Sequence, residues 1–208
     1  MNLAPQVTQG LAAMGVELGE AARDRAIAHL HLIAKWNRVH NLTAVREPEQ
    51  MVVVLLLDSL SLLPHLGEAR TLIDVGSGAG FPGIPIAIAR PDVQVTLLDS
   101  SHKKGTFLEQ ARTELGLVNV RVACERVEQF KPEGGFDVVV SRAFADLADF
   151  VAQAQHLVAP GGRMLAMKGV YPFEEIARVP ATHRVADVVE LTVPSLDAKR
   201  HLVRVEAA

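Results

Sequence analysis

Cysteine is almost absent from this sequence. Among its 208 residues there is a single cysteine, Cys124. One cysteine excludes a disulfide within the chain and a metal site built from a cysteine cluster, and we expect no metal. The expected role of Cys124 is that of a small buried hydrophobic residue at the end of a strand.

An excess of charge and a long hydrophobic run are missing as well. The chain has 24 acidic and 21 basic residues, so any contact with nucleic acid is expected to depend on a local basic patch. The longest uninterrupted apolar run, Met51 to Leu57, is too short to cross a bilayer. The N-terminus also lacks a basic start followed by an apolar signal core. We therefore expect a cytoplasmic protein.

The hydrophobic content that is present suits one sizeable core. Of the 208 residues, 49% are hydrophobic, which fits one domain with an appendage better than two full domains. We predict an N-terminal helical extension over residues 1–66 and a second part over residues 67–208. In the extension, apolar residues at helical spacing predict one helix around Ile27–Ala34 and another from Pro48 to Leu63.

Strand-like and helical segments alternate after residue 70. Short aliphatic and β-branched runs predict parallel strands at 70–75, 93–98, 118–123, 136–141 and 163–168. Helical stretches are expected near 84–90, 102–116 and 146–158. This alternation predicts an α/β fold, a Rossmann-like, mostly parallel sheet with right-handed crossovers and with ligands at the carboxyl ends of its strands.

The C-terminal part departs from this alternation. Two strand-like runs, Val185–Val193 and His201–Val205, are joined by Pro194–Arg200, which leaves no room for a crossover helix. They should form an antiparallel hairpin. A seven-stranded sheet with an antiparallel last strand is the architecture of class I S-adenosylmethionine-dependent methyltransferases, and ordinary dehydrogenases lack it.

The segment Thr71–Gly83 joins a buried strand to a glycine-rich turn. The turn carries three alternate glycines, Gly76, Gly78 and Gly80. Glycine lets the backbone turn sharply and lets a ligand approach the amides closely. The segment therefore predicts a cofactor site between a strand and a helix.

Two cofactors fit this turn. The register Gly78–Gly83 matches the fingerprint of dinucleotide-binding folds, in which a helix N-terminus receives a pyrophosphate. In the second register, Asp74 precedes the glycines and is placed to face the cationic groups of S-adenosylmethionine, which carries no phosphate. Asp99 ends the next strand, where a carboxylate can bond a ribose diol, and it suits either cofactor.

A set of motifs in a fixed order narrows the choice. These are Trp36 with His40–Ala44, Asp58–Leu60, Asp74–Pro85, Leu97–Ser100 with Lys103 and Lys104, Ser141–Phe144, Met167–Gly169 and Arg200–Leu202. In these motifs the chain resembles, over nearly its whole length, the bacterial 16S rRNA guanine-N7 methyltransferase family, also called glucose-inhibited division protein B. The resemblance implies methyl transfer from S-adenosylmethionine to N7 of guanine 527 in the decoding-region loop of 16S rRNA.

The resemblance also implies cofactor contacts. They fall on Gly76, Phe81, Val127, Glu128 and Arg142. Glu128 suits the adenine amino group, although a solvated glutamate would explain it as well. Arg142 follows a predicted strand and lies at the active-site edge, although an ion pair with an acid of the next helix, Asp146 or Asp149, would also explain it.

The predicted reaction needs no general base. Guanine N7 carries a lone pair in the plane of the base, so direct attack on the methyl group requires mainly alignment and electrostatics. We assign Arg142 and Phe144 as the residues that orient the guanine. Phe144 could equally be a core residue.

Basic residues near the predicted active-site edge are candidates for phosphate contacts. They are His40, Arg46, Lys103, Lys104, Lys168, Lys199, Arg200 and His201. Each alone could be a solvated surface charge, and Trp36–Arg46 could simply be a helix end with its loop. The expected partner is 16S rRNA or the small ribosomal subunit, with no membrane, no DNA and a monomeric protein. Two alternatives remain, a nicotinamide-dependent oxidoreductase and a non-catalytic rRNA-binding assembly factor.

Overall fold

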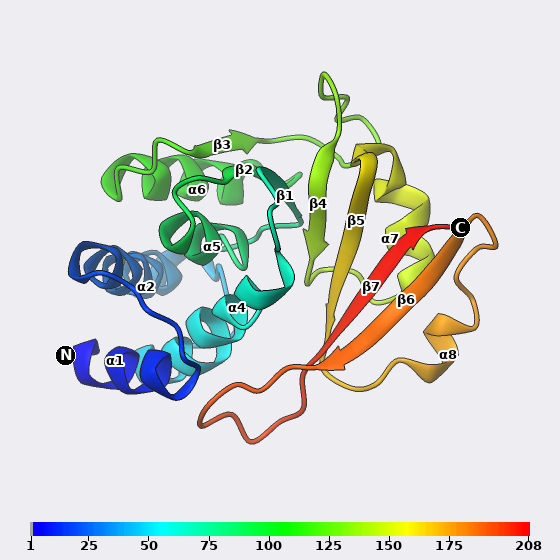
Figure 1. Ribbon diagram of the computed structural model, residues 1–208. Helices are drawn as coiled ribbons and strands as arrows, with labels where there is room; N and C mark the ends of the chain where they lie inside the picture. The colour runs from blue at the N-terminus through cyan, green and yellow to red at the C-terminus, as the bar shows by residue number, and fades with distance from the viewer. Residues whose placement is uncertain (1) are drawn as a thin grey trace.

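The computed structural model describes residues 2–208 and is built around one seven-stranded sheet. The strand order is β3-β2-β1-β4-β5-β7-β6 (Figure 1). The strands are β1 (Thr71–Val75), β2 (Gln94–Leu98), β3 (Val120–Ala123), β4 (Phe136–Ser141), β5 (Val158–Lys168), β6 (His183–Glu190) and β7 (His201–Ala207). This order places the carboxyl ends of β1 and β4 side by side at the centre of the sheet.

The strand directions agree with those predicted from the sequence. Strands β1 to β5 are parallel to one another, and β7 pairs antiparallel with both β5 and β6. The predicted α/β fold with an antiparallel last strand is therefore confirmed. The start of β5 was predicted wrongly, because the strand begins at Val158 and includes Gly161 and Gly162, residues that usually interrupt a strand.

Helices cover both faces of the sheet (Figure 1). The α-helices are α1 (Ala4–Ala13), α2 (Glu20–His40), α3 (Pro48–Met51), α4 (Asp58–Leu60), α5 (Gly83–Ala89), α6 (His102–Glu114), α7 (Leu147–Ala154) and α8 (Phe173–Ile176). Three short segments have other helical hydrogen bonding, namely the π-helix η1 (Val52–Leu57) and the 3-10 helices η2 (Leu63–His65) and η3 (Gln155–Leu157).

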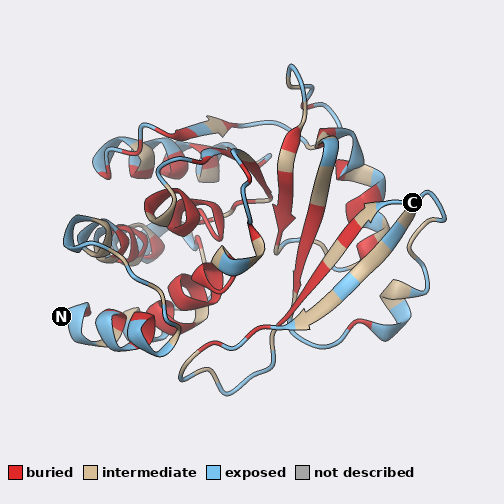
Figure 2. Ribbon diagram, viewed as in Figure 1, coloured by how far each residue is buried: buried red, intermediate tan, exposed pale blue. Residues whose placement is uncertain are grey.

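The two faces of the sheet form two cores, as side-chain alternation along a strand requires. Leu72 of β1 packs in one core with α2, η1, α5 and α6, and its neighbour Ile73 packs in the other core with α7. Figure 2 shows buried residues along the central strands and along the helices beside them. Among the described residues, no helix combines the length and the apolar character that crossing a membrane requires.

The N-terminal helices share the first core with the sheet. Leu30 and Ile33 of α2 and Leu56 of η1 are at most 1% exposed, and they belong to the same cluster as Leu72 of β1. The helix predicted from Pro48 to Leu63 is present, but its middle is the π-helix η1, which directly precedes Asp58. Short π-helical turns inside helices occur frequently at functional sites.

Candidate functional site

The loop after β1 crosses the end of β2. Gly76 adopts a φ of 76°, a left-handed conformation that residues with a side chain rarely adopt. The amides of Gly76 and Ser77 donate to the carbonyl of Leu98, with distances of 2.8 and 3.1 Å. The loop is therefore fixed over the carboxyl ends of two neighbouring strands, where open α/β sheets bind their ligands.

Asp99, the residue after β2, holds the loop from the other side. One carboxylate oxygen, Oδ2, accepts a bond of 2.9 Å from the Gly78 amide and lies 3.4 Å from Lys104 Nζ. The other oxygen accepts from the Ser101 amide at 2.9 Å. A carboxylate offers about four acceptor positions, so Asp99 can still accept a bond from a ligand hydroxyl.

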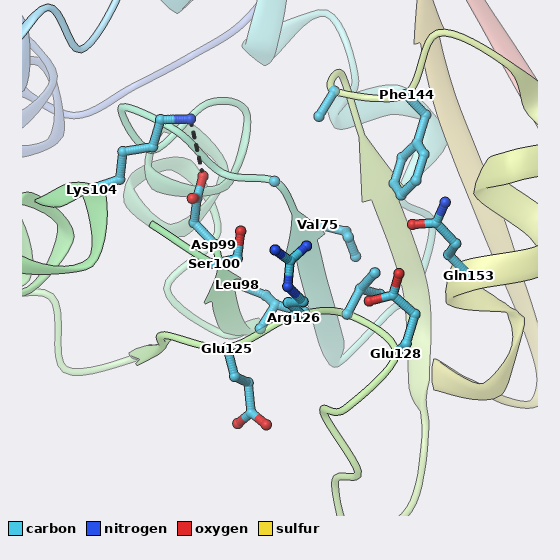
Figure 3. Close-up of a pocket in the computed structure, with 13 residues that line it drawn as sticks. Val75, Leu98, Asp99, Ser100, Lys104, Glu125, Arg126, Glu128, Phe144 and Gln153 are labelled. Atoms are coloured by element: carbon cyan, nitrogen blue, oxygen red, sulfur yellow. Dashed lines mark ion pairs between the residues drawn. The ribbon is translucent and has the colours of Figure 1, made fainter. Parts of the chain in front are cut away.

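A cavity of about 270 Å³ lies beside this loop. In Figure 3, Asp99 and Lys104 lie on one side of it, Arg126 and Glu128 reach in from the loop after β3, and Gln153 of α7 lies opposite. The predicted cofactor-binding and guanine-orienting residues that line the cavity are Gly76, Asp99, Val127, Glu128 and Phe144. Four segments that are distant in the sequence therefore meet at one carboxyl edge.

Asp74 does not line this cavity. Its side chain lies on the same face of β1 as Leu72, where it is fully buried and accepts a bond of 2.9 Å from the Gly83 amide through Oδ2. Burial raises the pKa of Asp74 to about 7, which the bond from Gly83 partly opposes. The second oxygen, Oδ1, is buried and has no hydrogen-bond partner within the protein. Asp74 thus connects the loop to the start of α5 and keeps one acceptor unused.

Phe81 is also outside the cavity. Its ring lies 4.9 Å from the ring of His29, and it is 6% exposed. His29, on α2, bonds through Nε2 to the carbonyl oxygen of Ala79 at 3.0 Å. The glycine turn is therefore anchored on its far side by the N-terminal extension, and Phe81 belongs to that anchor. The remaining predicted glycines, Gly78 and Gly80, do not line the cavity either.

Arg142 forms an ion pair, but with a different acid from those expected. Its Nη2 lies 3.4 Å from Oδ2 of Asp58 and 3.5 Å from the carbonyl oxygen of Val54. Asp146 instead pairs with Arg178. The second terminal nitrogen of Arg142, Nη1, is buried without a hydrogen-bond partner. One side of the guanidinium is therefore held by the N-terminal extension, and a donor on the other side is unused.

Phe144 lies between the second core and the cavity. Its ring is half-buried, lies 5.2 Å from the ring of Phe150 and packs at the edge of the second core. It also lines the cavity (Figure 3). One face of the site is therefore a fixed aromatic surface.

Several predicted RNA-binding residues are engaged within the protein. Lys168 Nζ donates to the carbonyls of Phe144 and Ala145, both at 3.0 Å, and lies 2.7 Å from Glu175 Oε2. Arg200 Nε lies 3.1 Å from Asp58 Oδ1. These contacts use all three donors of Lys168 and one side of the Arg200 guanidinium. Both side chains therefore hold parts of the protein together at the carboxyl edge of the sheet.

Other basic side chains remain accessible. Arg46, Lys103 and Lys199 are exposed and His40 is half-buried, whereas His201 is 5% exposed and pairs with Lys168 across β7 and β5. That pairing puts the end of β5 next to the start of β7. The accessible side chains come from the α2–α3 connection, α6 and the β6–β7 loop.

The match to known proteins covers most of the chain. The sequence profile of the family described as rRNA small subunit methyltransferase G, or GidB, matches residues 23–203. The chain belongs to this family. The resemblance noted in its motifs is thereby confirmed.

Relatives of this methyltransferase G family chain match it from end to end. A ribosomal RNA small subunit methyltransferase G from Nitrosospira multiformis is 54% identical, over 100% of this chain and 99% of that protein. One from Neisseria meningitidis is also 54% identical, over 98% of each. Among solved structures, the O-methyltransferase TomG from Streptomyces achromogenes aligns over 100% of both chains with a TM-score of 0.61 and 16% identity. An Aquifex aeolicus methyltransferase aligns over 72% of this chain and 90% of its own, with a TM-score of 0.57 and 21% identity. These structures show the fold.

Some cavity residues of this family member were not predicted. They are Ser100, Glu125, Arg126, Ala143 and Gln153, and Lys104 had been assigned to RNA alone. All but Gln153 follow β2, β3 or β4, so the strand-end rule that selected Asp99 could have found them. Gln153 lies on α7, and no local pattern marks it.

Cys124 was predicted wrongly as a buried residue. It is exposed, and its Sγ lies 3.5 Å from His102 Nδ1. The strand β3 ends at Ala123, so Cys124 lies just outside the core.

The His29 anchor should make stability depend on pH. Burial lowers the pKa of His29 from 6.5 to about 4, which the bond to Ala79 partly opposes. As the pH falls, His29 is protonated in the unfolded chain before it is protonated in the folded protein. The contribution of neutral His29 to the free energy of unfolding is therefore complete above pH 6.5 and is lost as the pH falls to about 4. Between pH 7 and 4, the wild type should lose about 3 kcal/mol of unfolding free energy relative to His29→Gln.

Urea unfolding of both proteins across this pH range measures the difference. Asp74, whose raised pKa acts in the opposite direction, is present in both proteins and cancels. A difference that does not change with pH would show that His29 is not held neutral by its burial.

Proposed function

We propose that this chain transfers a methyl group from S-adenosylmethionine to N7 of a guanine in small-subunit rRNA, and that the target is guanine 527 of 16S rRNA. The observation that carries the proposal is the meeting of the glycine turn, Asp99, Glu128 and Phe144 around one cavity at the carboxyl edge of the sheet. Membership of the methyltransferase G family supports the substrate.

The residues at this edge fit the cofactor. Asp99 is placed for the ribose hydroxyls, and Glu128 can accept from the adenine amino group across the cavity. Asp74 lies behind the turn and outside the cavity, so it would support the cofactor site by holding the Gly83 amide. When bound, S-adenosylmethionine supplies an activated methyl group and a positive charge, and Asp99 and Glu128 provide acidic groups near it.

The protein's part in the reaction is to orient the guanine. The lone pair of N7 attacks the methyl carbon directly, so no side chain has to remove a proton. The unused Nη1 of Arg142 is suited to donate to guanine O6, the acceptor that arginine commonly reads on this base. The half-buried ring of Phe144 gives the base a surface to stack on.

The rRNA backbone would meet the accessible basic side chains. These are Arg46, Lys103, Lys199 and the half-buried His40. Engaged side chains, Lys168 and Arg200 among them, would act by shaping the edge. We propose a monomer that acts in the cytoplasm on 16S rRNA or the small subunit, without a membrane or DNA partner.

The geometry opposes the nicotinamide alternative. A dinucleotide needs free amides in the register Gly78–Gly83 for its pyrophosphate. The amide of Gly78 donates to Asp99, those of Gly80 and Phe81 to the Ser77 carbonyl, and that of Gly83 to Asp74. These bonds occupy four of the five amides of this register and leave only that of Ala79 for a phosphate.

Methyl transfer to small ribosomal subunits tests the proposal. Labelled S-adenosylmethionine would be supplied with subunits from cells that lack this protein, followed by chemical cleavage at N7-methylguanine. Label at one guanine of the decoding-region loop is the expected result. Label on another base would overturn the proposed target. No label on subunits or naked rRNA, with cofactor binding intact, would favour the assembly factor.

Replacement of Asp99 tests the cofactor site separately. Asp99→Ala removes the acceptor for the ribose and the bond to the Gly78 amide, so affinity for S-adenosylmethionine should fall at least about tenfold. Isothermal titration calorimetry measures the change. The matched control is Asp92→Ala, which removes an acid before β2 that pairs only with Arg90 in an ion pair. Equal affinity of Asp99→Ala and the wild type would exclude Asp99 as a cofactor contact.

A further inference from the structure

Asp58 is a buried carboxylate held between two arginines. Its side chain is 1% exposed, and each of its oxygens has a different guanidinium partner. Oδ2 lies 3.4 Å from Arg142 Nη2, and Oδ1 lies 3.1 Å from Arg200 Nε. Asp58 is therefore the shared anion of a three-residue cluster, Arg142–Asp58–Arg200.

The cluster joins three parts of the chain. Asp58 begins α4 in the N-terminal extension, Arg142 follows β4, and Arg200 directly precedes β7. The extension holds Arg142 a second time through the carbonyl of Val54, in the π-helix η1. Two loops of the active-site edge are thus connected through one side chain of a helix that lines neither the glycine turn nor the cavity.

Stability alone does not explain this arrangement. Removing a carboxylate from water is costly, and burial raises the pKa of Asp58 while the two arginines oppose the rise. Buried ion clusters are often no more stabilising than apolar residues of similar size. A cluster placed at the reactive edge of the sheet is better explained by the orientation it gives to its members.

The orientation of Arg142 depends on this cluster. Asp58 and Val54 hold Nη2, which leaves Nη1 as the unpartnered, buried donor. Since the guanidinium is planar, fixing one nitrogen on two acceptors also fixes the direction of the other. Without the carboxylate, the side chain of Arg142 would be free to turn away from the site.

We propose that Asp58 is a positioning residue that fixes Arg142 and Arg200 for the rRNA substrate, so that Arg142 presents Nη1 to the target guanine. This inference rests on the proposed function. It extends the site to a residue in the N-terminal extension and gives that extension a part in catalysis. It also explains why Arg200, although braced internally, lies at the edge where the substrate enters.

The test is a mutant cycle read in methyl transfer. Asp58→Asn should lower kcat on small ribosomal subunits about tenfold or more, because the guanidinium loses its fixed position. The affinity for S-adenosylmethionine should stay within about twofold, since Asp58 does not line the cavity. In a chain that already carries Arg142→Ala, Asp58→Asn should have little further effect on kcat.

The matched control is Asp137→Asn. Asp137 lies at the start of β4, at the opposite end of the sheet, and accepts from the amides of Arg70 and Thr71. Its replacement should lower the melting temperature but leave kcat of the folded protein unchanged. A purely structural Asp58 would behave in the same way, and that result would overturn the proposal.

A second variant covers the case in which Asp58→Asn does not fold. Asp58→Glu keeps the charge and moves it by one methylene, so it should lower kcat when Arg142 is present. When Arg142 is alanine, only the contact to Arg200 remains, and the change should have little effect on kcat. A wild-type rate for Asp58→Glu, or equal losses in both backgrounds, would overturn the inference. Absence of methyl transfer by the wild type would instead count against the proposed function itself.

Discussion

Replacement of Arg142 by alanine is expected to lower kcat for methyl transfer to small ribosomal subunits by about a hundredfold or more. The reason is the loss of a donor, Nη1 of the residue that follows β4, which is buried without a hydrogen-bond partner among the described residues. Removing one such donor from an active site commonly costs a factor of about 100 to 1,000 in rate. Single-turnover transfer from labelled cofactor, with the cofactor saturating, measures the effect on the reaction.

Cofactor affinity distinguishes the two roles predicted for Arg142. If Arg142 acts mainly on the guanine, the dissociation constant of S-adenosylmethionine should change by less than about tenfold when the rate falls. The control is Arg178→Ala, which removes an exposed arginine paired with Asp146 near the same edge. An unchanged rate for Arg142→Ala would remove Arg142 from the site. A loss confined to cofactor affinity would reassign it to the methionine end.

Replacement of Gly76 by alanine should disable the cofactor site. The residue has a φ of 76°, and a Cβ there would lie 2.6 Å from the Cβ of Ala143, which also lines the cavity. Either the turn or the loop after β4 must move, and a displacement of about 1 Å at a reactive site can cost about a hundredfold. We expect kcat/KM for S-adenosylmethionine to fall by about that factor.

Two further variants show whether the effect of Gly76→Ala comes from the collision with Ala143 or from the strained backbone. Gly134→Ala imposes nearly the same strain, at a φ of 77°, but its Cβ would meet no atom within 4 Å. It should fold and react like the wild type apart from a small loss of stability. Adding Ala143→Gly to Gly76→Ala removes the colliding carbon and should restore part of the activity. Full activity of Gly76→Ala alone would show that the ligand does not approach this turn.

The sequence predicted the parts of the site that depend on local pattern. Strand ends and alternate glycines led to Asp99 and Gly76, because the carboxyl ends of parallel strands share one edge in any doubly wound sheet. Glu128 came only from the resemblance to the family. The strand pattern also contained the information that Asp74 lies outside the cavity. Strand alternation puts it on the face of Leu72, toward α5, and so away from the cavity.

The sequence could not predict which side chains pair across the fold. Asp146 and Asp149 were reasonable partners for Arg142 because they are near in sequence, but tertiary packing brings Asp58 of the extension beside it. Lys168 was likewise expected to contact a phosphate, although the carbonyls of Phe144 and Ala145 and the carboxylate of Glu175 take its donors. The π-helical turn before Asp58 has no sequence marker either, since its valines and leucines form an ordinary apolar run.

The position of β7 sets the order in which this protein can be completed during its synthesis. β5 and β6 are both finished before β7 exists, yet each pairs with β7 and not with the other. Until the ribosome has made His201–Ala207, both strands therefore have an open edge able to pair with other chains. Arg200, which enters just before β7, joins Asp58 at the same late stage. A nascent chain that already contains the whole glycine turn consequently still lacks the contacts that β7 and Arg200 make with β5 and Asp58.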